Sequence, residues 1–246
     1  MIAKCFETEL IHKVGNLEVA DYGSKAVRLR RIANLGLSVP SGFLLSKDFV
    51  SEAVNSSKFT ISGIFENLEG LYALRASPTE RDWGSVDTIL NLGISDVYVK
   101  QLAIQIGHGP ALEVYRRFIN SFSVLVFGLD LELFEELYHK ESRLINPDQH
   151  GFLDENVLLS IVELSKRKFK QKVGREFPQS LEEQLDLAFL AMSRSWYRPS
   201  VKILRAARGA PSDAGVGIIL QEMAFGIGKY DISKIKLNML IMDCFE

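Results

Sequence analysis

Cysteine is scarce in this 246-residue chain, where it occurs only as Cys5 and Cys244 near opposite ends. Two such residues are too few for a disulfide framework or a zinc site, so we expect free thiols in a reducing compartment. No window reaches the roughly 18 apolar residues that a membrane helix needs. The charges mixed into the first 13 residues argue against a signal peptide. These absences predict a soluble, cytoplasmic protein that does not bind a membrane.

Charge of one sign is also lacking, because 29 basic and 31 acidic residues give a net charge of −2. This balance argues against a strongly cationic nucleic-acid binder, and we expect no nucleic-acid partner. An apolar content of 47% excludes intrinsic disorder. The four histidines are scattered without paired spacing, so we expect no histidine metal centre.

Apolar periodicity predicts a helix-rich chain with a few strands. Helices are expected over residues 25–35, from Ser46 or Asp48 toward 54, from 110 to about 146, from 154 to 172, over 181–196 and over 199–207. Strands are expected near 43–45, over 71–75 and over 216–225, with a loop over 76–84. The predicted fold class is α+β, with a small mixed sheet.

Two cationic side chains lie where a phosphate could bind. Lys25 ends the segment Tyr22-Gly23-Ser24-Lys25 just before a helix, and a helix N-terminus favours anions. Arg75 leaves a buried strand, where a guanidinium could contact phosphate with two hydrogen bonds. The alternatives are a solvent-exposed lysine in a capped first turn and a structural salt bridge. The basic run over 166–175 is typical of a solvated helix face, with an anion-binding surface as its alternative.

Six segments, taken in order over residues 20–228, resemble the pyruvate, phosphate dikinase family. They are Gly23-Ser24-Lys25 followed by 34–43 (G-G-K-G and G-L-P-V-P-P-G-F in the family), Arg75 with 87–93 (M-D-T-[IV]-L-N-L-G), 115–119 (Y-R-R-F-I), 177–179 (F-P-Q), 194–196 (R-S-W) and 221–226 (V-Q-x-M-V-F-G). The resemblance implies an incomplete ATP-grasp nucleotide-binding domain over 1–228, with a helical insertion at about 110–175. Residues 229–246 depart from the pattern as a divergent tail.

The resemblance also implies a nucleotide site. Lys25 and Arg75 would contact the ATP phosphates as catalytic residues, and Gly84 would sit in the loop that closes over them. Thr88 belongs to the matched M-D-T stretch and is assigned to the same site, and the strand from Gln221 to Met223 would lie beside the adenine. The family uses ATP, with Mg²⁺ bridging its phosphates, to phosphorylate a swivelling histidine domain that converts pyruvate to phosphoenolpyruvate. No Mg²⁺ ligands are found in this chain.

The chain departs from the family pattern in ways that affect its expected activity. Ser24 and Ala26 replace two glycines beside the lysine, and Asp82 adds a negative charge to the phosphate loop. Nothing matches the family's later acidic segment, its histidine domain or its pyruvate-binding barrel. We therefore expect a truncated gene product, the ATP-binding portion of a phosphotransferase, with little turnover alone and its missing part supplied by another chain. The alternative is a non-catalytic remnant or interaction module.

Overall fold

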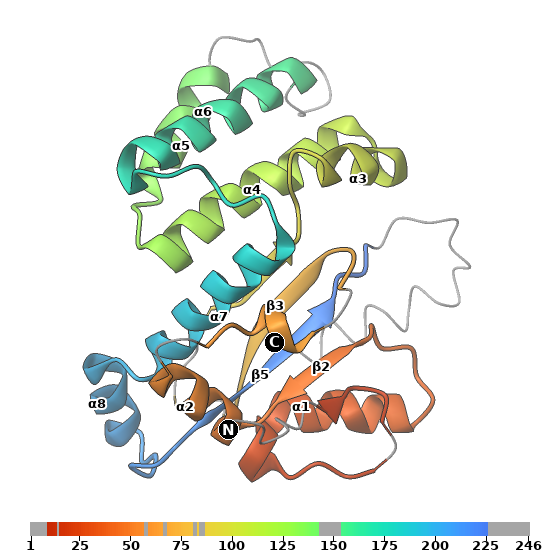
Figure 1. Cartoon of the computed structure of the whole chain (residues 1–246), viewed down its shortest axis with the longest axis vertical. Helices are drawn as coiled ribbons and strands as arrows, with labels where there is room; N and C mark the ends of the chain where they lie inside the picture. The colour runs from red at the N-terminus through yellow and green to blue at the C-terminus, as the bar shows by residue number, and fades with distance from the viewer. Residues whose placement is uncertain are drawn as a thin grey trace.

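The fold is described here from a computed structural model, which describes residues 9–13, 15–56, 59–65, 68–80, 83, 87–142 and 154–225. In chain order its elements are β1 (Glu9–Leu10), α1 (Val19–Asn34), β2 (Gly42–Leu45), α2 (Lys47–Asn55), the 3₁₀ turn η1 (Ser62–Ile64), β3 (Tyr72–Pro78), β4 (Ile89–Leu92), α3 (Tyr98–Ile106), α4 (His108–Phe127), α5 (Glu132–Ser142), α6 (Glu155–Val173), α7 (Leu181–Trp196), α8 (Pro199–Ala207) and β5 (Val216–Glu222). The predicted α+β class, rich in helix, is confirmed (Figure 1).

The strands form one sheet in the order β1-β2-β5-β3-β4. Every described pair is antiparallel, so the expectation of a mixed sheet is wrong. The connection between β3 and β4, residues 79–88, is too short for the crossover that parallel neighbours need. The longest pairing joins β3 to β5, from Tyr72 opposite Glu222 to Pro78 opposite Val216.

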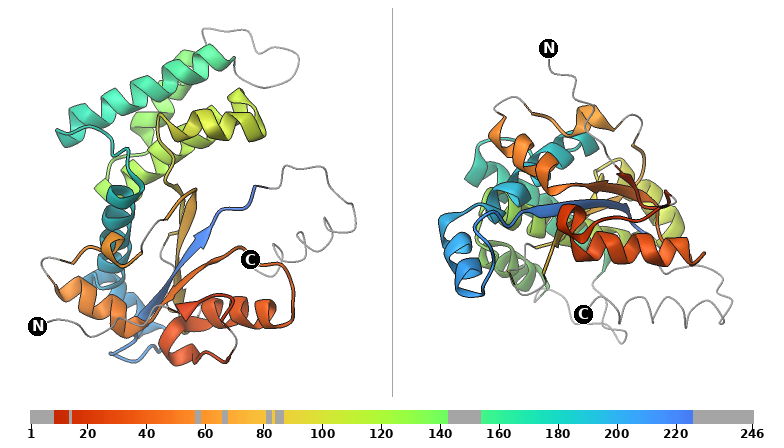
Figure 2. Two further views of the ribbon diagram at one scale, coloured as in Figure 1. Left: turned by 45° about the vertical axis from the view of Figure 1, so that its right-hand side comes forward. Right: turned by 90° about the horizontal axis from the view of Figure 1, so that it is seen from below.

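Each face of the sheet is covered by different helices (Figure 2). On one face, strand residues such as Leu74 and Leu220 pack with α2 and α7 in the main core. On the other face, Ala26 and Leu29 of α1 pack against Ile219 in a smaller core. The arrangement follows from alternation, because successive side chains of a strand point to opposite faces.

Helices α3 to α6 form a lobe at one end of the sheet, drawn at the top of Figure 1. Its centre is a group of phenylalanine rings, in which Phe177 lies 5.8 Å from Phe118, 5.7 Å from Phe122 and 5.1 Å from Phe169. The helical region expected at about 110–175 is thus present as α4, α5 and α6, interrupted at Gly128 in the left-handed conformation. The domain boundaries themselves stay a prediction.

Several predicted helix ends are confirmed. Ser46 caps α2 by accepting a hydrogen bond from the Phe49 amide, and Asp154 caps α6 by accepting one from the Asn156 amide. Helix α7 has the predicted bounds, and α8 begins at Pro199. Within the described ranges, no helix is long and apolar enough to cross a bilayer.

Candidate functional site

Arg75 lies in the middle of β3, on the face of the sheet that α1 covers. Its neighbours Leu74 and Ala76 belong to the main core, so alternation directs Arg75 to the opposite face. Its Nη1 atom donates a hydrogen bond to Oε1 of Gln221 over 3.2 Å. Burial lowers the pKa of Arg75, yet a guanidinium remains protonated near neutral pH. The strand therefore presents a half-buried positive charge.

Helix α1 contacts β3 through a glycine. Gly23 has φ 78° and ψ 165°, so the regular helix restarts after it. A Cβ atom at Gly23 would lie 1.7 Å from the Ser77 carbonyl oxygen, which means that only glycine fits. The neighbouring strand β5 also approaches α1 closely, because a Cβ atom at Gly217 would lie 2.4 Å from the Tyr22 carbonyl oxygen.

Ser77 joins the two elements by hydrogen bonds. Its side-chain oxygen accepts a hydrogen bond from the Ala26 amide over 3.0 Å, and the side chain is fully buried. Next to it, the Ser24 hydroxyl donates to the Pro78 carbonyl oxygen over 3.2 Å. The first turn after Gly23, which carries Lys25, is thus fixed to the strand that carries Arg75.

This arrangement suits an anion. Lys25 stands two residues after Gly23 and Arg75 two residues before Ser77, so the Gly23–Ser77 contact brings the segments that carry both cations side by side. A helix N-terminus adds partial positive charge to the same region. A lysine, an arginine and a helix N-terminus together form the usual chemistry of a phosphate site.

The serine beside the lysine carries no strain. Ser24 replaces a glycine of the family pattern, and a side chain with a Cβ atom makes a positive φ costlier. Among the described residues the only non-glycine with positive φ is Asn91, and the positive φ of this turn falls on Gly23. Ser24 is therefore compatible with the turn.

Gln221 and Met223 have different surroundings although both were assigned to the nucleotide site. The buried Gln221 side chain accepts from Arg75 and donates from Nε2 to the Pro40 carbonyl oxygen over 3.3 Å. Met223 is partly buried against the main core, and its amide donates to the Leu71 carbonyl oxygen over 2.8 Å. Gln221 thus contacts one of the two predicted phosphate-binding residues, through its hydrogen bond to Arg75.

Thr88 lines a pocket of its own, away from the Gly23–Ser77 contact. Thr88 precedes β4 and lines a pocket of about 500 Å³ with residues of α4, among them Arg116 and Asn120. Gly84 and Asp82 lie outside the described residues. The half-buried Trp83 nearby packs against the main core.

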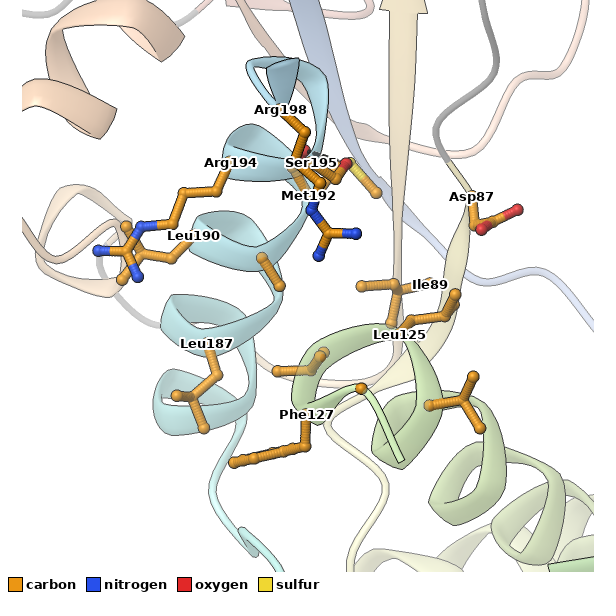
Figure 3. A pocket seen from close by; sticks show the side chains of 14 residues that line it. Asp87, Ile89, Leu125, Phe127, Leu187, Leu190, Met192, Arg194, Ser195 and Arg198 are labelled. Atoms are coloured by element: carbon orange, nitrogen blue, oxygen red, sulfur yellow. Dashed lines mark hydrogen bonds between the residues drawn. The ribbon is translucent and has the colours of Figure 1, made fainter. Parts of the chain in front are cut away.

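A separate cavity of about 480 Å³ lies between the end of α4, α7 and β4. Its walls include apolar side chains such as Leu125 and Met192 (Figure 3). Figure 3 shows the Arg198 guanidinium over the cavity and the Arg194 guanidinium directed to the other side of α7. Neither Lys25 nor Arg75 lines this cavity.

The described residues support neither a metal site nor an anion site on the basic run of α6. Within the described ranges no group of three His, Cys, Asp or Glu residues could hold a metal. Lys166 of the basic run is paired with Asp96 at 2.7 Å and Glu163 at 2.8 Å, and Lys170 and Arg175 are also in ion pairs. These pairs favour the prediction of a charged surface over that of an anion site.

Sequence reasoning missed Ser77. The residue is two positions after Arg75 in a strand, and side chains two apart share a face. Had the strand been extended beyond Arg75, this alternation would have placed Ser77 beside the arginine.

Relatives of this chain include members of the family that its motifs resemble. No family model matches the chain. Curated relatives include the pyruvate, phosphate dikinase of Clostridium symbiosum, 31% identical over 228 residues that cover 83% of this chain and 26% of the relative. The chloroplastic enzyme of Mesembryanthemum crystallinum is 30% identical over 229 residues, covering 83% and 24%. That of Rhizobium meliloti is 28% identical over 225 residues, covering 83% and 25%. The chain thus spans about a quarter of the length of the curated relatives that it matches, and the resemblance is confirmed.

Proposed function

We propose that this chain, a homologue of the pyruvate, phosphate dikinases over 83% of its length, binds ATP, with Lys25 and Arg75 contacting the phosphates. One observation carries the proposal: Gly23 packs on Ser77 so closely that the lysine-bearing turn and the arginine-bearing strand become neighbours. Two cations from different elements, beside a helix N-terminus, are complementary in sign to a triphosphate.

Gln221 would orient the arginine. Its side chain bonds both Arg75 and the Pro40 carbonyl oxygen, which fixes the plane of the amide. A guanidinium held in this way loses less conformational freedom when it contacts a phosphate. The positions of Gly84, Thr88 and Met223 at the nucleotide remain part of the proposal by resemblance.

The described residues contain no group of three His, Cys, Asp or Glu side chains that could hold a metal by themselves. We therefore propose that Lys25 and Arg75 contact the phosphates without a protein-bound Mg²⁺. We expect ATP to bind in the presence of EDTA, since the two cationic side chains would contact the phosphates directly.

Calorimetric titration with ATP tests the proposal. We expect Lys25→Ala and Arg75→Ala each to weaken ATP binding at least about tenfold, because a hydrogen bond to a charged group contributes roughly 1.5–3 kcal/mol. Lys168→Ala and Arg194→Ala are the matched controls, because these residues lie on α6 and α7, outside the candidate site. Unchanged affinity in both site variants, or no binding by the wild-type chain, would contradict the proposal.

We further propose that the chain contributes the nucleotide site to a phosphotransferase of this type, with the remaining groups supplied by another chain. By itself it should form little phosphoenolpyruvate from pyruvate, phosphate and ATP in a coupled spectrophotometric assay. Turnover at the rate of an added pyruvate, phosphate dikinase would refute this expectation. If ATP does not bind, the interaction module is the favoured alternative.

A further inference from the structure

We propose that Ser77 is a positioning residue of the nucleotide site, an inference that rests on the proposed function. Through its hydroxyl it fixes the helical turn that carries Lys25 to the strand that carries Arg75. Ser77 is not among the residues that the family resemblance assigned to the site.

The contact between Ser77 and α1 is buried and is made by a hydrogen bond. Ser77 has no exposed surface, and the Ala26 amide that it accepts from belongs to a residue only 1% exposed. An amide at the start of a helix has no partner within the helix, so it needs an acceptor from outside. Without the Ser77 hydroxyl, water could not readily replace that acceptor.

The surface beneath the turn is made of small residues. Ser77 is opposite Gly217 in the β3–β5 pairing. Gly217 lies under the Tyr22 carbonyl and Ser77 under Gly23, so the chain of α1 rests directly on the two strands. The hydroxyl of Ser77 links this platform to the turn after Gly23, beside the bond from the Ser24 hydroxyl to the Pro78 carbonyl oxygen.

This bond fixes the backbone at Lys25 relative to β3. Lys25 immediately precedes Ala26, and Arg75 lies on the same face of β3 as Ser77. Loss of the bond would let the first turn shift relative to Arg75 while leaving both cations present. The expected result is weaker contact with a ligand that needs both cations at once.

A double-mutant cycle on ATP affinity tests the proposal, with ATP titrated into the full chain in EDTA. We expect Ser77→Ala to weaken binding about tenfold, the effect of losing one charge-assisted contact. In the Lys25→Ala background the same change should weaken binding less than about twofold, because residues that act through one another are not additive. Ser165→Ala is the matched control, since Ser165 is a buried serine whose hydroxyl has no partner among the described residues.

Two further measurements separate positioning from folding. Hydrogen exchange should show faster exchange of the Ala26 amide in Ser77→Ala, with or without ATP. Ser77→Cys keeps an atom in the place of the hydroxyl oxygen, a larger one and a weaker acceptor, and it replaces the alanine variant in the cycle if that variant does not fold.

The proposal would be overturned if Ser77→Ala weakened ATP binding equally in the wild-type and Lys25→Ala backgrounds. It would also be overturned if Ser77→Ala kept wild-type ATP affinity while its Ala26 amide exchanged faster. Absence of ATP binding by the wild-type chain would refute the proposed function first, and Ser77 would then have no site to position. Slow exchange of Ala26 in Ser77→Ala would instead refute the hydrogen bond alone.

Discussion

Replacing Gly23 by alanine should cost far more stability than replacing a glycine in open space. Alanine at φ 78° and ψ 165° occupies a region that is nearly exclusive to glycine, at a cost of about 1–3 kcal/mol. The new Cβ atom would lie 1.7 Å from the Ser77 carbonyl oxygen, whereas ordinary contact begins at 3.4 Å. To restore ordinary contact, α1 and β3 would have to separate by about 1.7 Å.

That separation removes the bond from the Ala26 amide to Ser77, now 3.0 Å long. A buried amide without a partner costs about 1–3 kcal/mol. Strain and the lost bond together predict a loss of about 4 kcal/mol in the free energy of unfolding, measured by urea denaturation. ATP binding should be lost at the same time, because the turn that carries Lys25 is displaced.

Two other glycines separate the contribution of backbone strain from that of steric overlap. Gly128 has φ 69° and ψ 26° with no atom near a new Cβ, so its alanine variant should lose only about 1 kcal/mol from strain. Gly217 has ordinary φ but a carbonyl oxygen 2.4 Å from a new Cβ, so Gly217→Ala tests the steric contribution. If Gly23→Ala loses no more than Gly128→Ala, the close packing of α1 on β3 is refuted.

Two further predictions concern stability elsewhere. Burial raises the pKa of Glu113, but hydrogen bonds from Arg116 and Arg117 outweigh burial and hold the pKa below the ordinary value of a glutamate. A lowered pKa stabilises the folded state above the unfolded pKa, and this stabilisation is lost as the pH falls through the lowered pKa. Glu113→Gln should therefore cost about 1 kcal/mol at pH 7 and converge with wild type in urea melts at acidic pH; a constant difference would contradict this. Gln184→Ala should lower the free energy of unfolding by about 3 kcal/mol, because the buried side chain accepts a hydrogen bond from the Gly93 amide and donates to two carbonyl oxygens. The control Gln171→Ala, at an exposed position, should lower it by less than about 0.5 kcal/mol in the same melts.

Helices with a cap and an amphipathic pattern could be predicted from the sequence, and one without either could not. Helix α7 follows Ser180, which accepts from the Glu183 amide, and its bounds were predicted. Helix α3 follows Val97, which makes no capping bond, and its exposed side carries Ile104 with 87% of its surface accessible. An apolar residue on the outer face hides the 3.6-residue period, so α3 was missed.

Strand ends depended on partners that the sequence does not reveal. Strand β3 was expected to stop at Arg75 but continues to Pro78, because β5 pairs with it as far as Val216. Small residues and proline have low strand propensity, and pairing overrides it here. The same pairing brings Gln221 to Arg75 across 146 residues of sequence, a contact that no local pattern could predict.

The motifs shared with the pyruvate, phosphate dikinases divide into those that hold the fold and those that form the candidate site. Phe177 packs on Phe118, and the Trp196 ring nitrogen donates to the Ala214 carbonyl oxygen over 3.0 Å, so these matched residues stabilise the scaffold. They would be retained in a remnant that had lost every function. ATP binding is instead a prediction about Lys25 and Arg75, whose elements are brought together by the close contact between Gly23 and Ser77. Similarity over 83% of the chain supports the scaffold, whereas only ligand binding by these two residues can separate an active nucleotide site from a remnant.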